Sequence, residues 1–348
     1  MLHKVLLPVV LLILAFGFWM STDFKVISAG VAIFLFGMLS LEQGFNAFTG
    51  GTLERVLRRV TSNRLRSLGF GLVTTALMQS SSLVTVISIS FLSAGLITLV
   101  AGIGIVFGAN LGTTTGAWLI AGFGLKINIA SYAMPMLVFG VVLLFQSTRR
   151  LKGIGYVLCG MGFLFLGIHY MKEGFDAFKD AIDLTRYSVT GYPGVLTYLL
   201  VGVVATVIMQ SSHATLALTI TALAAYQISY ENALAIAIGS NVGTTITAIL
   251  GSLSANEAGK RLAGAHLVFN LMSALITVLL IYELVDGVNW VADFLRIAED
   301  DYTLKLAIFH TLFNTIGVIF MLPFIPRLAH ALELLIPDQV LEVDQPKY

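Results

Sequence analysis

Residues 71–81 of the chain read GLVTTALMQSS, and residues 202–212 read GVVATVIMQSS. The two stretches lie 131 residues apart and share the same Gly, Val, Thr, Met, Gln, Ser and Ser positions. At the same separation, GANLGTT at 108–114 matches GSNVGTT at 239–245. Because chance rarely keeps separate blocks in register, we infer that the chain contains two copies of one structural unit.

Two shorter blocks extend this match at an offset of 130: GFNAF at 44–48 with GFDAF at 174–178, and LVF at 137 with LVF at 267. The whole chain divides accordingly. We expect an N-terminal span (1–25), repeat 1 (26–146, with a hairpin at 67–94), repeat 2 (154–282, with a hairpin at 194–226), an acidic extracytoplasmic loop (283–303), a last span (304–325) and a cytoplasmic tail (326–348).

The composition places both copies in a membrane. Of 348 residues, 57% are hydrophobic and 11% are charged, whereas a soluble domain carries about 25% charged residues. A net charge of +1 excludes a nucleic-acid binder, because no basic field is available. The apolar runs are continuous and do not alternate, which disfavours a β-barrel. Cys159 is the single cysteine, so an intrachain disulfide is excluded.

The predicted fold is therefore an all-α polytopic membrane protein with about eight full spans plus two re-entrant helical hairpins. A span needs about 20 apolar residues. The expected spans are 5–20, 26–41, 98–121, 126–146, 154–171, 231–252, 262–282 and 304–325. The first is expected to be retained, the alternative being a cleaved signal peptide.

Polar clusters at 79–82 and 210–212 interrupt the two remaining apolar stretches, as in segments that turn inside a membrane protein. If both stretches turn back, each repeat crosses the membrane three times, and the second copy is inverted. Basic residues at 55–66 and 149–152 then share one side, opposite the acidic residues of 283–303. The positive-inside rule supports this topology, with both termini cytoplasmic.

The hairpin tips form the candidate site. Residues 67–125 contain no Asp, Glu, Lys, Arg or His, and Glu231 is the only formal charge from 187 to 256. Ser, Thr, Asn and Gln supply donors and acceptors. The serines of each cluster suit N-caps of a second half-helix, whose free N–H groups favour anions. An oxyanion could be held there without arginine.

Charge neutrality then requires a partner cation. Helix ends contribute only about half a unit of positive charge each, and these segments lack Lys and Arg. Na⁺, a hard cation, suits the hydroxyl, amide and carbonyl oxygens. Two unit charges 4 Å apart attract by roughly 4 kcal/mol at an effective dielectric near 20, so the ions would bind interdependently. Proton coupling is disfavoured, because no acidic or histidine relay is present.

Other motifs leave alternatives open. Glycines at every fourth position from 104 to 116 let helices approach closely, and would also permit unwinding that frees carbonyls near Asn110 and Asn241. His266-x-x-x-Asn270 and His310-x-x-x-Asn314 fit either helix packing or substrate contact. No hydrolase motif is present, so an enzyme is not expected. Interhelical hydrogen bonding without transport and a passive anion channel remain alternatives.

The paired Gln-Ser-Ser and Gly-x-Asn-x-Gly-Thr-Thr motifs resemble those of the type II sodium-dependent phosphate cotransporter family, over about residues 30–325. The resemblance implies Na⁺-coupled symport of inorganic phosphate into the cell by alternating access, and homodimers with independent protomers. It implies a bacterial protein of the inner (plasma) membrane, surrounded by the lipid bilayer. Transport of another oxyanion, arsenate or sulfate, is the alternative.

The family's motifs imply two overlapping sets of contacts. The substrate set is Gln79, Ser80, Ser81, Ser82, Gln210, Ser211, Ser212, Asn110 and Asn241. The Na⁺ set is Gln79, Ser81, Asn110, Thr113, Thr114, Gln210, Ser212, Asn241, Thr244 and Thr245. Na⁺ is expected as the co-transported ion. In the second motif His213 stands where the family usually keeps a third serine.

Overall fold

The structure is a computed structural model that describes residues 2–49, 63–125, 129–181 and 189–338. Within these ranges every regular element is helical. The α-helices are α1 (Leu2–Met20), α2 (Thr22–Thr49), α4 (Arg64–Met78), α5 (Ser81–Ser93), α6 (Leu99–Trp118), α7 (Ile129–Leu144), α8 (Arg149–Ala181), α9 (Gly191–Met209), α10 (Ser212–Ala224), α11 (Tyr230–Ser252), α12 (Glu257–Leu279), α13 (Ile281–Phe294), α14 (Tyr302–Met321) and α15 (Ile325–Leu335).

Seven stretches among the described residues are long and apolar enough to cross a membrane. Six of them correspond to expected spans, and the seventh is α9, which the sequence assigned to a hairpin. The expected spans at 5–20 and 126–146 form helices, but their apolar parts are shorter, at Pro8–Met20 and Ser131–Leu144. The expected count of eight full spans is therefore corrected to seven long apolar stretches.

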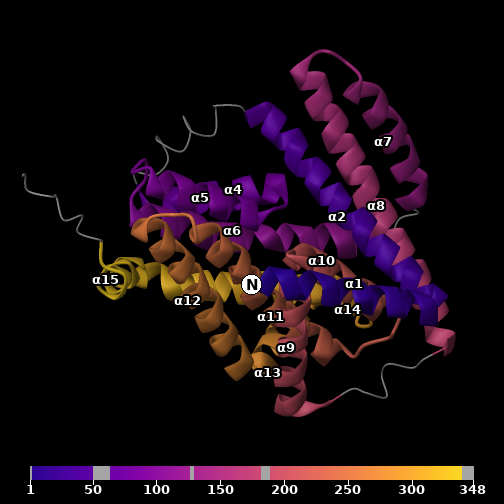
Figure 1. Ribbon diagram of the computed structural model, residues 1–348. Coiled ribbons are helices and arrows are strands. Elements are labelled where there is room, and N and C mark those ends of the chain that lie inside the picture. The colour runs from indigo at the N-terminus through magenta and orange to yellow at the C-terminus, as the bar shows by residue number, and fades with distance from the viewer. Residues whose placement is uncertain (1, 50–62, 126–128, 182–188, 339–348) are drawn as a thin grey trace, which may run out of the picture.

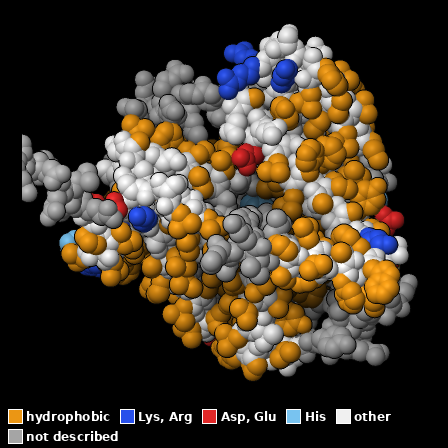
Figure 2. Space-filling model, in the orientation of Figure 1, with side chains coloured by type: hydrophobic (Ala, Val, Ile, Leu, Met, Phe, Trp, Pro, Cys, Tyr) orange, Lys and Arg blue, Asp and Glu red, His pale blue; other side chains and the backbone are white. Residues whose placement is uncertain are grey.

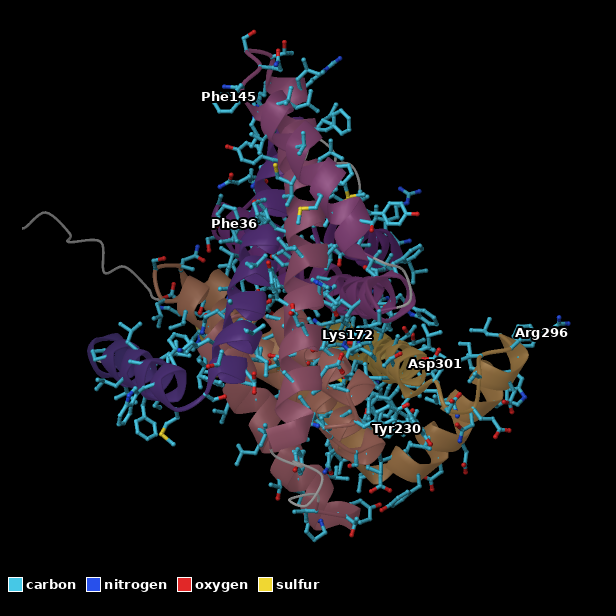
Figure 3. The ribbon with its side chains drawn as sticks, turned by 90° about the vertical axis from the view of Figure 1, so that its right-hand side faces the viewer. Phe36, Phe145, Lys172, Tyr230, Arg296 and Asp301 are labelled. Atoms are coloured by element: carbon cyan, nitrogen blue, oxygen red, sulfur yellow. The ribbon has the colours of Figure 1, made fainter. Side chains whose placement is uncertain are left out.

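Two long helices, α2 and α8, pack along each other, and α7 packs along α8 (Figure 1). Hydrophobic side chains dominate the surface, and a group of basic side chains gathers over the α7–α8 end (Figure 2). Arg149, Arg150 and Lys152, at the start of α8, are all exposed. Phe36 of α2 and Phe145 beyond α7 lie on this arm (Figure 3), and both are exposed.

The rest of the molecule is built from the duplicated unit. α4, α5 and α6 form the first copy, and α9, α10 and α11 form the second, with α4 packed on α6 as α9 is on α11. A β-carbon on Gly108 would strike the backbone oxygen of Leu68, and one on Gly239 would strike that of Leu199. The same close helix approach therefore occurs twice, 131 residues apart, so the internal repeat expected from the sequence is present in the structure.

A second repeat, at an offset of 44, relates α12–α13 to α14–α15. α12 packs on α5 and α15, and α14 packs on α10 and α13. The sequences LAGAHLVFN at 262–270 and LAIFHTLFN at 306–314 coincide at Leu, Ala, His, Phe and Asn. Of this repeat, the sequence analysis identified only the shared His-x-x-x-Asn.

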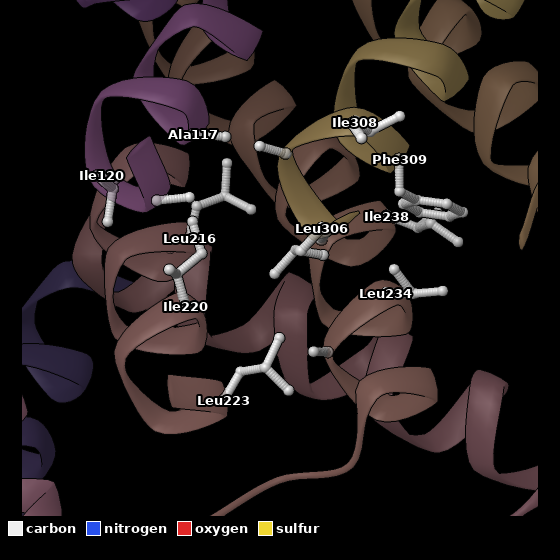
Figure 4. Packing of buried hydrophobic residues seen from close by; sticks show 14 of the residues in the cluster. Ala117, Ile120, Leu216, Ile220, Leu223, Leu234, Ile238, Leu306, Ile308 and Phe309 are labelled. Carbon is white, nitrogen blue, oxygen red and sulfur yellow. The ribbon is translucent and has the colours of Figure 1, made fainter. Parts of the chain in front are cut away.

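Buried side chains of α6, α10, α11 and α14 form the central core (Figure 4). Leu216 and Ile220 of α10 face Ala117 of α6 and Leu306 of α14 within this cluster. Because both copies contribute to one core, the two tips are fixed relative to each other by shared packing.

Three expected boundaries are wrong. The supposed loop at 283–303 is mostly α13, because Ile281, Leu284, Val288 and Ala292 recur at helical spacing and are buried, while the acidic side chains face outward. Figure 3 shows Arg296 and Asp301 in the turn that follows. Residues 325–335 of the supposed tail form α15, which packs on α12.

The segments 42–66 and 172–190 were expected to lie along the membrane surface. Their described beginnings instead continue α2 to Thr49 and α8 to Ala181. The basic residues 55–59, on which the topology argument partly rests, lie outside the described residues.

Candidate functional site: a cavity between two broken-helix tips

The first tip is the break between α4 and α5. α4 ends at Gln79, which has a left-handed backbone conformation (φ 53°). Ser80 is extended, and its hydroxyl accepts a hydrogen bond from the Leu83 N–H at 3.3 Å. A polar residue that turns the chain and a serine that caps the next helix are what the Gln-Ser sequence predicts.

The second tip repeats this geometry 131 residues later. Gln210 also has φ 53°, and the Ser211 hydroxyl accepts from the Ala214 N–H at 3.2 Å. α5 spans Ser81–Ser93 and α10 spans Ser212–Ala224. Each tip therefore presents the N-terminus of a half-helix, as expected from the sequence.

Both tips line one cavity of about 460 Å³. Seven expected site residues contribute to its wall: Gln79, Ser80, Ser81, Ser82, Gln210, Ser211 and Ser212. Met38 and Leu39 of α2 close one side. The site residues are thus brought together from positions 131 residues apart. Figure 2 shows a hollow on this face, with an acidic side chain at its rim.

The Asn-Gly-Thr-Thr residues do not line this cavity. α6 and α11 continue as helices through them, so the unwinding considered from the sequence does not occur in this structure. Their hydroxyls donate to backbone oxygens one turn earlier: Thr114 to Leu111 at 2.8 Å, Thr244 to Ser240 at 2.9 Å, and likewise Thr113 to Asn110 and Thr245 to Val242. Intrahelical bonds of this kind leave their carbonyls inside the helix.

Asn241 belongs to a buried polar network with α14. Its Nδ2 donates to Asn314 Oδ1 at 2.8 Å, and its Oδ1 lies 3.1 Å from His310 Nε2. Asn314 Nδ2 in turn donates to the His310 carbonyl at 2.8 Å. The second His-Asn motif therefore packs between helices and holds α11 to α14.

The repeat-related motif on α12 is not paired in this way. Asn110 Nδ2 donates to the Val106 carbonyl of its own helix at 2.9 Å. Both ring nitrogens of His266, and Asn270 Oδ1, are buried without a hydrogen-bond partner. The two copies thus differ: the Asn241 set is closed, and the Asn110 set is open.

Each tip also contacts the opposite copy. Thr247 of α11 donates to the Ser82 hydroxyl at 3.0 Å. At the positions 131 residues away from this pair, His213 of α10 lies against Gly116 of α6. Gln79 Nε2 donates to Thr115 Oγ1 at 2.9 Å, whereas Gln210, whose counterpart position in α11 is Ile246, remains exposed.

The cavity contains one ionisable group that the sequence analysis missed. Glu42 of α2 lines it and is half-buried. Glu42 follows Leu35, Met38 and Leu39 at helical spacing, so the four residues share one face of α2. A carboxylate in an otherwise apolar spanning helix was the signal that could have identified it. No Lys or Arg among the described residues lines the cavity.

A second cavity, of about 240 Å³, lies beside the first and is mostly apolar. Phe34 and Leu41 of α2 and Phe165 of α8 line it, and Gln79 and His213 are shared with the polar cavity. No group of three or more His, Cys, Asp or Glu side chains that could hold a metal ion occurs among the described residues. A cation in this site would therefore be coordinated mainly by hydroxyl and amide oxygens.

Duplicated broken helices around a polar cavity, in a chain of long apolar helices, define a polytopic membrane protein of the kind that binds solutes between internal repeats. A family model described as Na⁺/Pi-cotransporter matches residues 33–173 and 192–323. This is most of the chain, which therefore belongs to that family, and the protein is a transporter and not an enzyme.

The relatives are bacterial. "Uncharacterized protein YqeW" of Bacillus subtilis is 29% identical over 320 residues, which cover 89% of this chain and 97% of the relative. "Putative inorganic phosphate export protein YjbB" of Escherichia coli K12 is 29% identical over 324 residues. That match covers 92% of this chain and 57% of the relative, so the chain spans little more than half of its length. No solved structure matches the chain at a significant level.

Proposed function

We propose that the protein is a Na⁺-coupled transporter of inorganic phosphate, in which both ions occupy the polar cavity and cross the membrane together. The observation that carries this proposal is the composition of the cavity wall. Two helix N-termini and a set of hydroxyls and amides face a space that is lined by one carboxylate and by no Lys or Arg among the described residues.

Phosphate would be held by the tips. The N–H groups that open α5 and α10 have no carbonyl partner in their own helix, and the helix dipoles favour an anion there. Ser81 and Ser212, at the first positions of these helices, add hydroxyl donors. This set resembles other anion sites at helix N-termini that need no cationic side chain.

Na⁺ would complete the charge balance. Partial charges of about half a unit at each helix end leave a phosphate ion uncompensated, and the Glu42 carboxylate increases the deficit. The oxygens of Gln79, Ser81, Gln210 and Ser212 suit a hard cation. Since each ion then favours binding of the other, transport by either ion alone is disfavoured, as a symporter requires.

Membrane placement supports the same mechanism. α5 and α10 have 13 residues each, so each is about 20 Å long, shorter than the roughly 30 Å hydrocarbon core. We infer that they enter the membrane and turn back, with the two copies in inverted orientation. Alternating access would exchange the closed Asn241 set and the open Asn110 set between the copies.

The distribution of basic residues favours an inner (plasma) membrane protein with both termini cytoplasmic. We further propose homodimers in which each protomer has its own cavity and works independently. Chemical cross-linking in the membrane would give a dimer band, and monomers alone would contradict this part of the proposal.

Direction has two candidates. Symport driven by an inward Na⁺ gradient moves phosphate into the cell, as the sequence predicts. The printed name of the Escherichia coli relative favours export instead. Arsenate or sulfate transport and a passive anion channel are the remaining alternatives.

Radiolabelled phosphate flux in proteoliposomes tests the proposal. We expect uptake with an inward Na⁺ gradient, loss of uptake when K⁺ replaces Na⁺, and reversal of flux when the gradient is reversed. Counterflow of labelled against unlabelled phosphate distinguishes a carrier from a channel. Equal flux in Na⁺ and K⁺ would contradict the coupling, and competition with arsenate and sulfate identifies the substrate class.

A further inference from the structure

His213 is the point at which the two tips differ most. It occupies the place that Ser82 has in the first tip. The Ser82 hydroxyl accepts a bond from Thr247, and the counterpart contact of His213 is with Gly116, where a β-carbon would strike the ring. The small Ser82 faces threonine and the large His213 faces glycine. The ring is therefore accommodated by a specific change in the opposite copy.

The ring has one free nitrogen. His213 is 4% exposed, and its Nε2 has no hydrogen-bond partner among the described residues. The ring is hydrogen-bonded to the backbone of Thr113, so this bond falls to Nδ1. The Thr113 N–H is used inside α6, and its carbonyl only accepts. Nδ1 therefore carries the hydrogen, and in the neutral imidazole Nε2 is an acceptor.

An acceptor is unusual at this position. His213 is the second residue of α10, directly after Ser212, where the surrounding backbone groups are donors suited to an anion. Oxygens without a proton gain nothing from an acceptor, and a buried acceptor left unpaired is costly. A P–OH group, by contrast, donates. At neutral pH phosphate and arsenate carry at least one proton, and sulfate carries none.

We propose that His213 determines substrate specificity by accepting a hydrogen bond at Nε2 from the protonated oxygen of the bound oxyanion. This inference rests on the proposed function. It commits the cavity to phosphate-like oxyanions, phosphate and arsenate, and excludes sulfate. His213 acts by selecting the substrate, beside the donors that bind every tetrahedral anion.

Glu42 is the competing acceptor, since its carboxylate also lines the cavity. Two observations favour His213. The ring belongs to the tip whose N–H groups would hold the anion, whereas Glu42 comes from α2. A full negative charge also repels the anion and attracts the cation. The two acceptors are separable by substitution.

The test uses the full chain in proteoliposomes and measures inhibition of labelled phosphate flux by unlabelled sulfate and arsenate. His213→Gln keeps a side chain of similar reach but places an amide donor in the cavity. A double variant, His213→Ser with Gly116→Thr, copies the Ser82–Thr247 pair of the first tip and guards against misfolding. His266→Gln is the control, because this buried histidine does not line the polar cavity.

We expect arsenate to inhibit the unaltered protein and sulfate to have no effect. In both His213 variants sulfate should become an inhibitor, at a concentration at least roughly tenfold lower than in the unaltered protein. The His266→Gln control should keep the original pattern. Sulfate exclusion that persists in both His213 variants would overturn the proposal, as would sulfate entry caused by Glu42→Gln alone. Absence of phosphate flux in the unaltered protein would instead contradict the proposed function.

Discussion

Replacing Glu42 by glutamine removes the one carboxylate that lines the polar cavity. A cavity of about 460 Å³ places a wall charge about 6 Å from an ion at its centre, where unit charges interact by roughly 3 kcal/mol at an effective dielectric of about 20. Glu42 is half-buried, and screening reduces this to about 1.4 kcal/mol, or about tenfold in affinity.

The sign of the effect differs for the two ions. Loss of a negative charge should lower the half-saturating phosphate concentration about tenfold and raise that of Na⁺ by a similar factor. Proteoliposome flux, measured over a range of each ion with the other saturating, gives both values. Glu42→Asp, which keeps the charge, is the matched control. A weaker phosphate affinity in Glu42→Gln would refute this charge argument, because it would mean that the carboxylate helps to bind the anion.

Three other changes test separate parts of the structure. Ser80→Ala and Ser211→Ala each remove a helix cap worth about 1 kcal/mol together with a wall hydroxyl, so flux should be lost while the protein still folds; normal flux in both variants would move the site elsewhere. Gly108→Ala drives a β-carbon into the backbone of α4 and should lower the melting temperature in detergent, and an unchanged melting temperature would show that the two helices separate freely. Asn314→Leu leaves buried partners unpaired, at a cost of about 1–3 kcal/mol, and should destabilise the protein more than Asn270→Leu, whose Oδ1 is already unpaired; equal losses would contradict the difference between the two copies.

The duplicated tips could be predicted from the sequence because their chemistry is local. A glutamine followed by serines specifies a turn and an N-cap wherever it occurs, and the fixed offset of 131 assigned the same structure to both copies. Position 82 and its counterpart 213 were paired by the same offset. The amphipathic α13 could also have been found, since its buried residues recur at helical spacing.

Tertiary contacts could not be predicted in this way. Glu42 lines the cavity only because α2 crosses both tips, and nothing near position 42 indicates that crossing. The contact of His213 with Gly116 joins elements that are almost 100 residues apart. The Asn110 and Asn241 motifs were expected beside the ions, but they lie within regular helices, since their side chains bond to nearby carbonyls or to α14.

The central claim is that the protein supplies no cationic side chain to the anion and that Na⁺ provides the missing charge. Calorimetric titration of the purified protein with phosphate, in Na⁺ and then in K⁺ at equal ionic strength, tests it most directly. The account predicts saturable binding in Na⁺ and binding in K⁺ that is weaker by at least roughly tenfold. Equal affinity in the two salts would contradict it.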